Sequence, residues 1–140
     1  MFERILVAYD GSDGAKAALR QSIELAKLLK AELHSISVEE HLPYYAASVS
    51  EVKATKEDID EYFRSLTKQA RDLAATSGVE METAIRQGYE VEEIVRMARE
   101  GGFHLLVLGY HGHSGIFGRI MGSTAQSIVR LAPCSVLLAK

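Results

Sequence analysis

The sequence predicts an α/β domain built on a five-stranded parallel sheet with helices on both faces. Short apolar runs alternate with longer amphipathic segments along the chain, which is typical of strand–helix repeats. The run at 5–8, and the run at 103–108 apart from His104, are apolar at consecutive positions, as expected for strands buried on both faces. The length of 140 residues fits one domain over residues 1–140, against a prior of ~150 residues per domain.

The first half of the chain contributes two strands and two helices to this prediction. The run 5–8 is a strand, and Asp10-Gly11 ends it. Ser12 or Asp13 can cap the helix that follows to about residue 30, and a second strand spans 33–38. Residues 41–55 show no clear period and are interpreted as a long connection to a helix over 57–76, which Gly78 ends.

The second half continues the alternation and ends on a strand. Residues 79–86 alternate apolar with charged side chains, which predicts a half-exposed strand at a sheet edge. A helix around 91–98 leads to the buried strand 103–108. A glycine-rich loop then precedes a helix over 123–131 and a closing strand over 134–139.

Composition excludes several classes of protein. Hydrophobic residues make up 47% of the chain and charged residues 25%, which is ordinary for a soluble domain. The net charge of −3 provides no basic field for nucleic acid. No apolar stretch approaches the ~20 residues that span a bilayer, the first residues do not resemble a signal peptide, and Cys134 is the single cysteine. These features predict a cytoplasmic location.

The segment from Gly109 to Thr124 carries the clearest chemical signal. Five of the fourteen residues from Gly109 to Gly122 are glycines, and glycine lets the main chain approach a ligand closely. Backbone N–H groups of such a loop, together with the start of the next helix, can converge on an anion. Ser123 and Thr124 would add hydroxyl donors. The sequence therefore predicts a phosphate site here.

A structural interpretation of the same segment competes with this one. Ser123 and Gln126 stand at capping-box spacing, with Ser123 as the cap, and the glycines can mark a simple turn. The segment is also neither a P-loop, because no G-x-x-x-x-G-K-[ST] is present, nor a dinucleotide fingerprint, because no G-x-G-x-x-G follows the first strand.

Asp10 follows the first strand directly and has two interpretations. Ligands of open parallel sheets bind beyond the strand ends, where the strand order reverses. If the first and fourth strands are neighbours, Asp10 and Gly109 flank that crevice, and the carboxylate can accept from a ribose or help hold Mg²⁺. The alternative is that Asp10 merely starts a turn.

Taken together, these stretches resemble the universal stress protein family. The resemblance rests on Ile5-Leu6-Val7-Ala8-Tyr9-Asp10-Gly11-Ser12, on Gly109-x2-Gly112-x9-Gly122-Ser123, and on Pro133-Cys134-Ser135-Val136-Leu137-Leu138. The middle segment matches the full G-x2-G-x9-G-[ST] signature of the ATP-binding branch. The resemblance covers essentially the whole chain. It implies the strand order 3-2-1-4-5 of the Rossmann-like, adenine nucleotide alpha hydrolase-like fold.

The resemblance also implies a set of nucleotide contacts, with ATP as the ligand and Mg²⁺ bound through its phosphates. No residue is assigned as a direct metal ligand. The implied contacts to adenine, ribose and phosphates are Ala8, Tyr9, Asp10, Val38, Leu108, Gly109, His111, Gly112, Gly122, Ser123 and Thr124.

The family commonly dimerises through its last strand, which here is 134–139. The sequence supports this independently, because Val136, Leu137 and Leu138 are apolar at successive positions of an expected edge strand, and pairing with a second copy would cover that edge. His111 and His113 lack a third ligand at suitable spacing, so we interpret them as loop histidines.

The predicted function is a nucleotide-dependent regulatory or stress-response module with at most slow ATP hydrolysis and with unknown protein partners. Two alternatives stay open. One is a slow ATPase or phosphotransfer enzyme that uses Asp10, His111 and Mg²⁺. The other is an interaction protein that binds no nucleotide and whose glycine loop is only structural.

Overall fold

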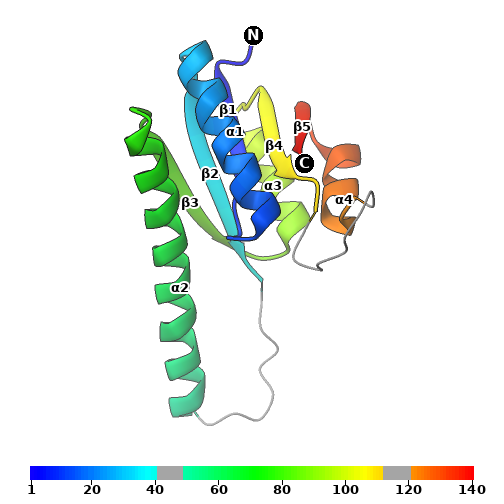
Figure 1. The fold of residues 1–140 in the computed structure, drawn as a ribbon. Coiled ribbons are helices and arrows are strands. Elements are labelled where there is room, and N and C mark those ends of the chain that lie inside the picture. Colours follow the sequence, from blue (N-terminus) through cyan, green and yellow to red (C-terminus); the bar gives the residue numbers. More distant parts are fainter. Residues whose placement is uncertain (41–48, 112–120) are drawn as a thin grey trace.

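The computed structural model describes residues 1–40, 49–111 and 121–140, and for residues 49–55 only the backbone (Figure 1). Strands and helices alternate strictly along the chain. The elements are β1 (Arg4–Ala8), α1 (Asp13–Leu29), β2 (Glu32–Glu39), α2 (Val49–Thr76), β3 (Met81–Gln87), α3 (Glu90–Glu100), β4 (Leu105–Gly109), α4 (Ser123–Leu131) and β5 (Ser135–Ala139).

The five strands form one parallel sheet in the order β3-β2-β1-β4-β5, which confirms the predicted order. Leu6 of β1 pairs with His34 on one side and with Leu106 on the other. The strand order reverses between β1 and β4, and the carboxyl ends of these two strands therefore flank the switch point of the sheet. The half-exposed β3 lies at one edge, as its alternating pattern predicts.

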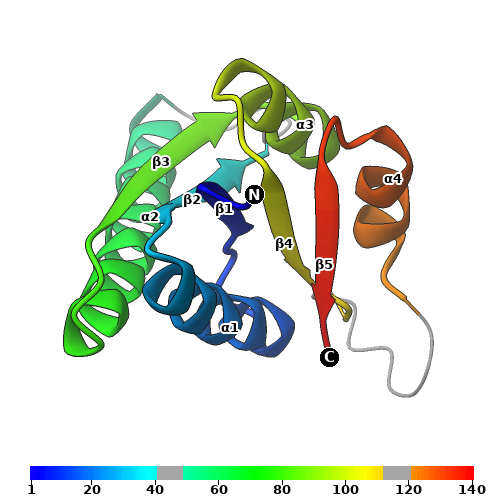
Figure 2. The ribbon, with the colours of Figure 1, turned by 90° about the horizontal axis from the view of Figure 1, so that it is seen from above.

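Two helices cover each face of the sheet (Figure 2). Ile5 and Val7 pack on the side of α1 and α2, in a core that includes Leu19 and Ala70. Leu6 points to the other face, where it joins a cluster with residues of α3 and α4. All three side chains of β1 are fully buried, so the consecutive apolar run reflects burial on both faces, as expected.

The second helix is longer than the sequence predicts. It begins at Val49 and therefore includes residues 49–55, which we interpreted as part of the connection. At ~1.5 Å per residue the 28-residue helix is about 42 Å long, whereas the eight residues of β2 span about 26 Å. Its first turns extend past the strand ends (Figure 1). These turns do not pack on the sheet and need no apolar face. The spacing of apolar residues therefore does not indicate a helix there.

The start of α1 and the end of α2 agree with the capping residues predicted from the sequence. Ser12 caps α1, since its hydroxyl accepts from the Ala15 N–H at 3.2 Å. The predicted Gly78 has φ +76° and lies two residues after Thr76, the last residue of α2, and the N–H of Val79 bonds back to the carbonyl of Ala74 at 3.0 Å. This is the left-handed ending for which glycine is favoured. No helix in the described part of the chain is long and apolar enough to cross a membrane.

Candidate functional site

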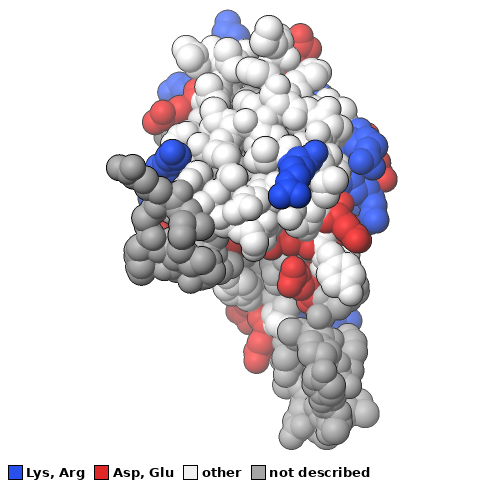
Figure 3. All heavy atoms as spheres, turned by 90° about the vertical axis from the view of Figure 1, so that its right-hand side faces the viewer, with Lys and Arg blue, Asp and Glu red and all other residues white. Residues whose placement is uncertain are grey.

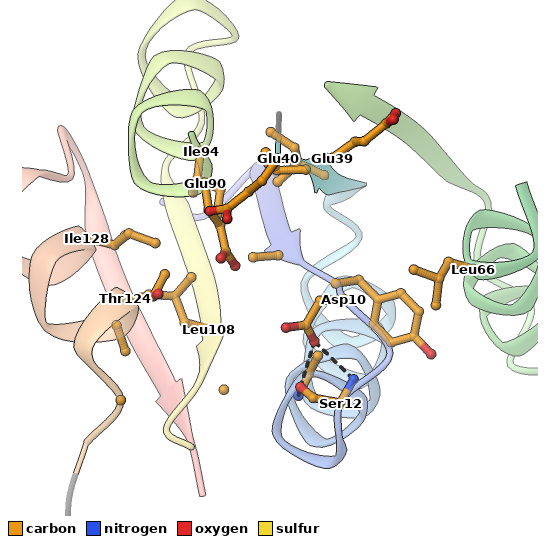
Figure 4. Close-up of a pocket in the computed structure, with 18 of the residues that line it drawn as sticks. Asp10, Ser12, Glu39, Glu40, Leu66, Glu90, Ile94, Leu108, Thr124 and Ile128 are labelled. Atoms are coloured by element: carbon orange, nitrogen blue, oxygen red, sulfur yellow. Dashed lines mark hydrogen bonds between the residues drawn. The ribbon is translucent and has the colours of Figure 1, made fainter. Parts of the chain in front are cut away.

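A cavity of about 680 Å³ opens at the carboxyl ends of β1, β2 and β4. Its volume lies within the range of small-molecule sites. The lining comes from both helical layers, because α1 and α2 contribute from one side and α3 and α4 from the other (Figure 4). The cavity therefore lies at the switch point, where ligands of doubly wound sheets bind.

The structure brings the residues named from the sequence together. Apart from Gly112, which lies outside the described residues, all of them line this cavity, although they come from β1, β2, β4, α4 and the segments that adjoin these elements. They are Ala8, Tyr9, Asp10, Val38, Leu108, Gly109, His111, Gly122, Ser123 and Thr124.

The start of α4 forms one end of the cavity. Gly122 occupies the N-cap and has no side chain to accept from the first turn, so the N–H groups of Ser123, Thr124 and Ala125 have no acceptor inside the helix. The N–H of Gly122 bonds to the carbonyl of Tyr110 at 2.9 Å. This bond holds the two ends of the glycine-rich segment together beside the cavity.

The capping-box interpretation is wrong for this helix. Ser123 is the first helical residue and not the cap, and the side chain of Gln126 donates to the carbonyl of Met121 at 2.9 Å. The start of α4 is thus built differently from that of α1, where Ser12 fills the cap. A helix start without a side-chain acceptor suits an anionic ligand.

Gly109 and Gly14 allow the backbones of β4 and α1 to touch. A Cβ on Gly109 would lie 2.5 Å from the carbonyl carbon of Gly14, and a Cβ on Gly14 would lie 2.2 Å from the carbonyl oxygen of His111. Such distances leave no room for a side chain. The sequence predicted that Gly109 lies close to a ligand, and the structure shows that its lack of a side chain makes room for the first turn of α1.

Asp10 both lines the cavity and organises the turn after β1. Its Oδ1 accepts from the backbone N–H of Ser12 at 3.0 Å and from the Ser12 hydroxyl at 2.6 Å (Figure 4). The two interpretations of Asp10 are therefore compatible, because a carboxylate that holds the turn also faces the cavity.

Tyr9 is buried between the sheet and α2. Its side chain is only 3% exposed, and its hydroxyl donates to Oε1 of Gln69 at 3.0 Å. Burial raises the pKa of this phenol above its ordinary value near 10, and the nearby Asp10 and Tyr62 raise it further, whereas Arg20 lowers it. Tyr9 thus lines the cavity and is also linked to α2 through its hydroxyl group.

We expect Tyr9→Phe to lower the free energy of unfolding by about 1 kcal/mol at pH 7, since it removes one buried hydrogen bond. Because the pKa of Tyr9 is raised in the folded state, the contribution of the phenol is fully present below pH 10 and is lost as the pH rises through the raised pKa. Urea unfolding of both proteins across alkaline pH tests this. A stability difference that stays constant above pH 10 would contradict it.

One wall of the cavity is apolar, and sequence reasoning found only part of it. Val38 and Leu108 were named, and the structure places further aliphatic side chains beside them from β2, α3 and α4: Ile36, Ile94, Ala125 and Ile128. These residues carry the ordinary signature of core positions. Only the topology reveals that the core ends in a cavity here.

Two further groups of lining residues were missed. Helix α2 contributes Ile59, Tyr62, Phe63 and Leu66, and the acidic lining residues beyond Asp10 are Glu39, Glu40, Asp58 and Glu90. The sequence predicted a helix here, and the structure adds that residues in its N-terminal half line the cavity. Nothing in the local sequence distinguishes the lining carboxylates from others on the surface.

Two of the histidines that the structure describes make ring contacts with aromatic neighbours. The ring of His111 stacks edge-on against Tyr110 at 4.8 Å between centroids, and that of His34 against Phe103 at 5.0 Å. His104 precedes β4 rather than lying within it. His113 lies outside the described residues, among which no group of three or more side chains could hold a metal ion. Cys134 is half-buried, and burial raises the pKa of its thiol.

The fold and the cavity define the class of protein: a doubly wound α/β domain with a ligand-sized cavity at its switch point, bordered by a helix start. The universal stress protein family model matches residues 1–140. The chain is 33% identical to universal stress protein YxiE of Bacillus subtilis, and the alignment covers 100% of both chains. The chain therefore belongs to the universal stress protein family.

Solved structures agree with this assignment. The universal stress protein UspA from Lactobacillus plantarum superposes with a TM-score of 0.85 at 25% identity, over 99% of this chain and 98% of that one. A universal stress protein from Archaeoglobus fulgidus, solved in complex with dAMP, has a TM-score of 0.65 at 24% identity, with complete coverage of both chains.

Proposed function

We propose that this universal stress protein binds an adenine nucleotide, ATP with Mg²⁺, in the cavity at its switch point and acts as a nucleotide-dependent regulatory module. The observation that carries the proposal is the convergence of ten residues, named from the glycine signature and the family pattern, on one cavity of about 680 Å³. The dAMP bound in the Archaeoglobus fulgidus protein represents the ligand class we propose.

The chemistry of the cavity supports a phosphate at the start of α4. The backbone donors there have no acceptor within the helix, and the helix dipole favours negative charge. Gly109 at the end of β4 also lines the cavity, and its lack of a side chain lets the first turn of α1 approach it. The apolar wall around Val38 suits a flat base. An elongated ligand with one anionic and one largely apolar end fits these features.

The proposed Mg²⁺ would be held mainly by the phosphates, with Asp10 as the adjacent carboxylate. Among the described lining residues there is no lysine or arginine, and these are the side chains that commonly neutralise a transferring phosphoryl group. We therefore propose that hydrolysis is slow and that the protein acts by holding the nucleotide, in the cytoplasm, for protein partners that recognise the bound state.

Mass spectrometry of the freshly purified protein tests this proposal. A bound adenine nucleotide at a stoichiometry near one per chain is the expected result, and it would identify the number of phosphates at the same time. Protein that carries no nucleotide and takes up neither ATP, ADP nor AMP at millimolar concentration would overturn the proposal.

We further propose that two copies pair through β5. This strand lies at the sheet edge, and its residues Val136, Leu137 and Leu138 are only half-buried. Val129 and Leu131 of α4 are exposed by 42% and 58%. Most of the face that carries α4 and β5 is uncharged, with charged side chains mainly toward its margins (Figure 3). An apolar edge of this kind is commonly covered by a partner.

Ser135→Lys should convert the proposed dimer to a monomer without unfolding it. Ser135 is exposed on β5, and an edge lysine opposes strand pairing between copies. Gln87→Lys at the other edge of the sheet, on β3, is the matched control and should leave the dimer intact. Sedimentation velocity distinguishes the two states, and a wild-type protein that sediments as a monomer would rule out pairing through β5.

A further inference from the structure

Helix α2 is supported differently along its length. Leu66, Ala70 and Ala74 are buried in the core that β1 shares with α1 and α2. From Lys56, where the description of its side chains begins, to Ser65, no residue of the helix is buried. Helices in proteins owe most of their stability to the packing of one face. The part of α2 before Phe63 therefore lacks the support that holds the rest of the helix. We call residues 56–62 the outer part of α2.

The apolar face of the outer part is directed at the cavity. Ile59, Tyr62 and Leu66 follow one another at helical spacing and all line the cavity, so one stripe runs from the core onto the cavity wall. Leu66 is buried, whereas Ile59 is half-buried and Tyr62 is 50% exposed. Apolar surface of the outer part thus stays accessible until a ligand fills the space beside it.

The outer part is also joined to the turn that follows β1. The hydroxyl of Tyr62 donates to the backbone carbonyl of Asp10 at 3.3 Å, and the carboxylate of Asp10 faces the cavity (Figure 4). The contact is close because the next residue is a glycine: a Cβ on Gly11 would lie 2.8 Å from Cδ2 of Leu66. A ligand that touches Asp10 therefore acts on the same turn that holds Tyr62.

Helices α2 and α4 lie on opposite sides of the cavity. Figure 4 shows Leu66 of α2 across from Thr124 and Ile128 of α4. A ligand that is held at the start of α4 and fills the cavity supplies the outer part of α2 with packing that the protein alone does not provide. Segments with few buried contacts open locally at low free energy, and a ligand that binds the ordered form closes them.

We propose that ligand binding in the cavity orders the outer part of α2, so that this segment reports whether the site is occupied. This inference rests on the proposed nucleotide binding and adds to it the element that responds. Because the first turns of α2 extend past the sheet (Figure 1), the response appears where a protein partner can reach it. The regulation then consists of a change in local order rather than a rearrangement of the sheet.

Hydrogen exchange measured by mass spectrometry tests the ordering directly. In the ligand-free protein, the amides of residues 56–62 should exchange faster than those around the buried Ala70. ATP with Mg²⁺ at about 100 times its dissociation constant should slow them by about 10- to 100-fold, the upper limit being set by mass action. The last turn of α1, which ends at Leu29 at the opposite end of the sheet from the cavity, is the control. Its local fraying should be unaffected by the nucleotide.

Glu61→Gly and Glu61→Ala give a second test that does not touch the ligand. Glu61 is exposed and is not among the lining residues. Both variants lose the same carboxylate, but glycine disfavours a helix relative to alanine by a factor of about five. If binding includes the ordering of this segment, the Glu61→Gly protein should bind ATP about three- to fivefold more weakly than the Glu61→Ala protein.

Ala75→Gly is the matched control in the part of α2 that the core supports. Ala75 is exposed and does not line the cavity, and its replacement makes the same exchange of alanine for glycine. The variant should unfold at a lower urea concentration and bind ATP as tightly as the wild type. A loss of affinity equal to that of the Glu61 pair would show that any weakening of α2 lowers affinity, and it would overturn the specific role of the outer part.

The remaining outcomes separate this inference from the proposed function. ATP binding in calorimetry, combined with unchanged exchange of residues 56–62, would overturn the ordering of α2 and leave nucleotide binding intact. Equal ATP affinities of the Glu61→Gly and Glu61→Ala proteins would do the same. Absence of binding for ATP, ADP and AMP alike would overturn both.

Discussion

Gly109→Ala is expected to weaken nucleotide binding at least tenfold and to lower the free energy of unfolding by about 1–3 kcal/mol, as overpacking commonly does. The added Cβ would lie 2.5 Å from the carbonyl carbon of Gly14 and 3.0 Å from the N–H nitrogen of Ala15. Neither neighbour is the flexible end of a side chain. The first turn of α1 must therefore move away from β4, and the cavity between them changes shape. Calorimetric titration and urea unfolding measure the two effects.

Gly78→Ala is the control for the loss of a glycine in general. Gly78 has φ +76° and nothing within 4 Å of an added Cβ, so its replacement costs backbone strain alone, about 1 kcal/mol. It lies at the end of α2 and does not line the cavity. We expect this variant to lose stability and to keep its nucleotide affinity. Unchanged stability and affinity in Gly109→Ala would show that α1 does not depend on this contact.

Thr124→Glu should abolish the binding of phosphorylated ligands while leaving the fold intact or slightly more stable. Thr124 is the second residue of α4 and lines the cavity (Figure 4). A carboxylate in the first turn of a helix is stabilising by about 0.3–1 kcal/mol. The same carboxylate would occupy and repel the anion site, and we expect the affinity for ATP to fall by about 100-fold or more, given repulsion in a partly enclosed cavity.

Two controls make the result of Thr124→Glu specific. Ser127→Glu adds the same charge to an exposed position of the same helix and should leave ATP binding unchanged. Adenosine, which has no phosphate, should lose much less affinity than ATP for the Thr124→Glu protein. ATP affinity equal to that of the wild type in a folded Thr124→Glu protein would show that the phosphates lie elsewhere.

The sequence predicts the sheet well because burial dictates its residues directly. The run from Ile5 to Val7 is apolar because both faces of β1 are covered. The strand order was predicted only from the resemblance to the family, because the alternation of elements indicates a parallel sheet but not its order. The start of α2 could not be predicted, because the turns from Val49 onward extend past the sheet. Periodicity detects a helix only where one side of it is buried.

The lining of the cavity was predicted as far as its residues lie in recognisable local signals. Gly109, Gly122 and Ser123 belong to one spaced pattern, and Asp10 follows a strand directly. Glu40 and Glu90 carry no such signal, because they come from segments fifty residues apart in the sequence and line one cavity only in the folded chain. Gly14 was missed for the same reason, since its partner Gly109 lies on another element.

Titration calorimetry of the wild-type protein with ATP and Mg²⁺ tests the central claim most directly. The account predicts one site per chain with a dissociation constant below the millimolar range, and competition by AMP for the same site. Heat of binding that is absent for ATP, ADP and AMP at millimolar concentration, with protein shown to be folded and free of co-purified nucleotide, would contradict it.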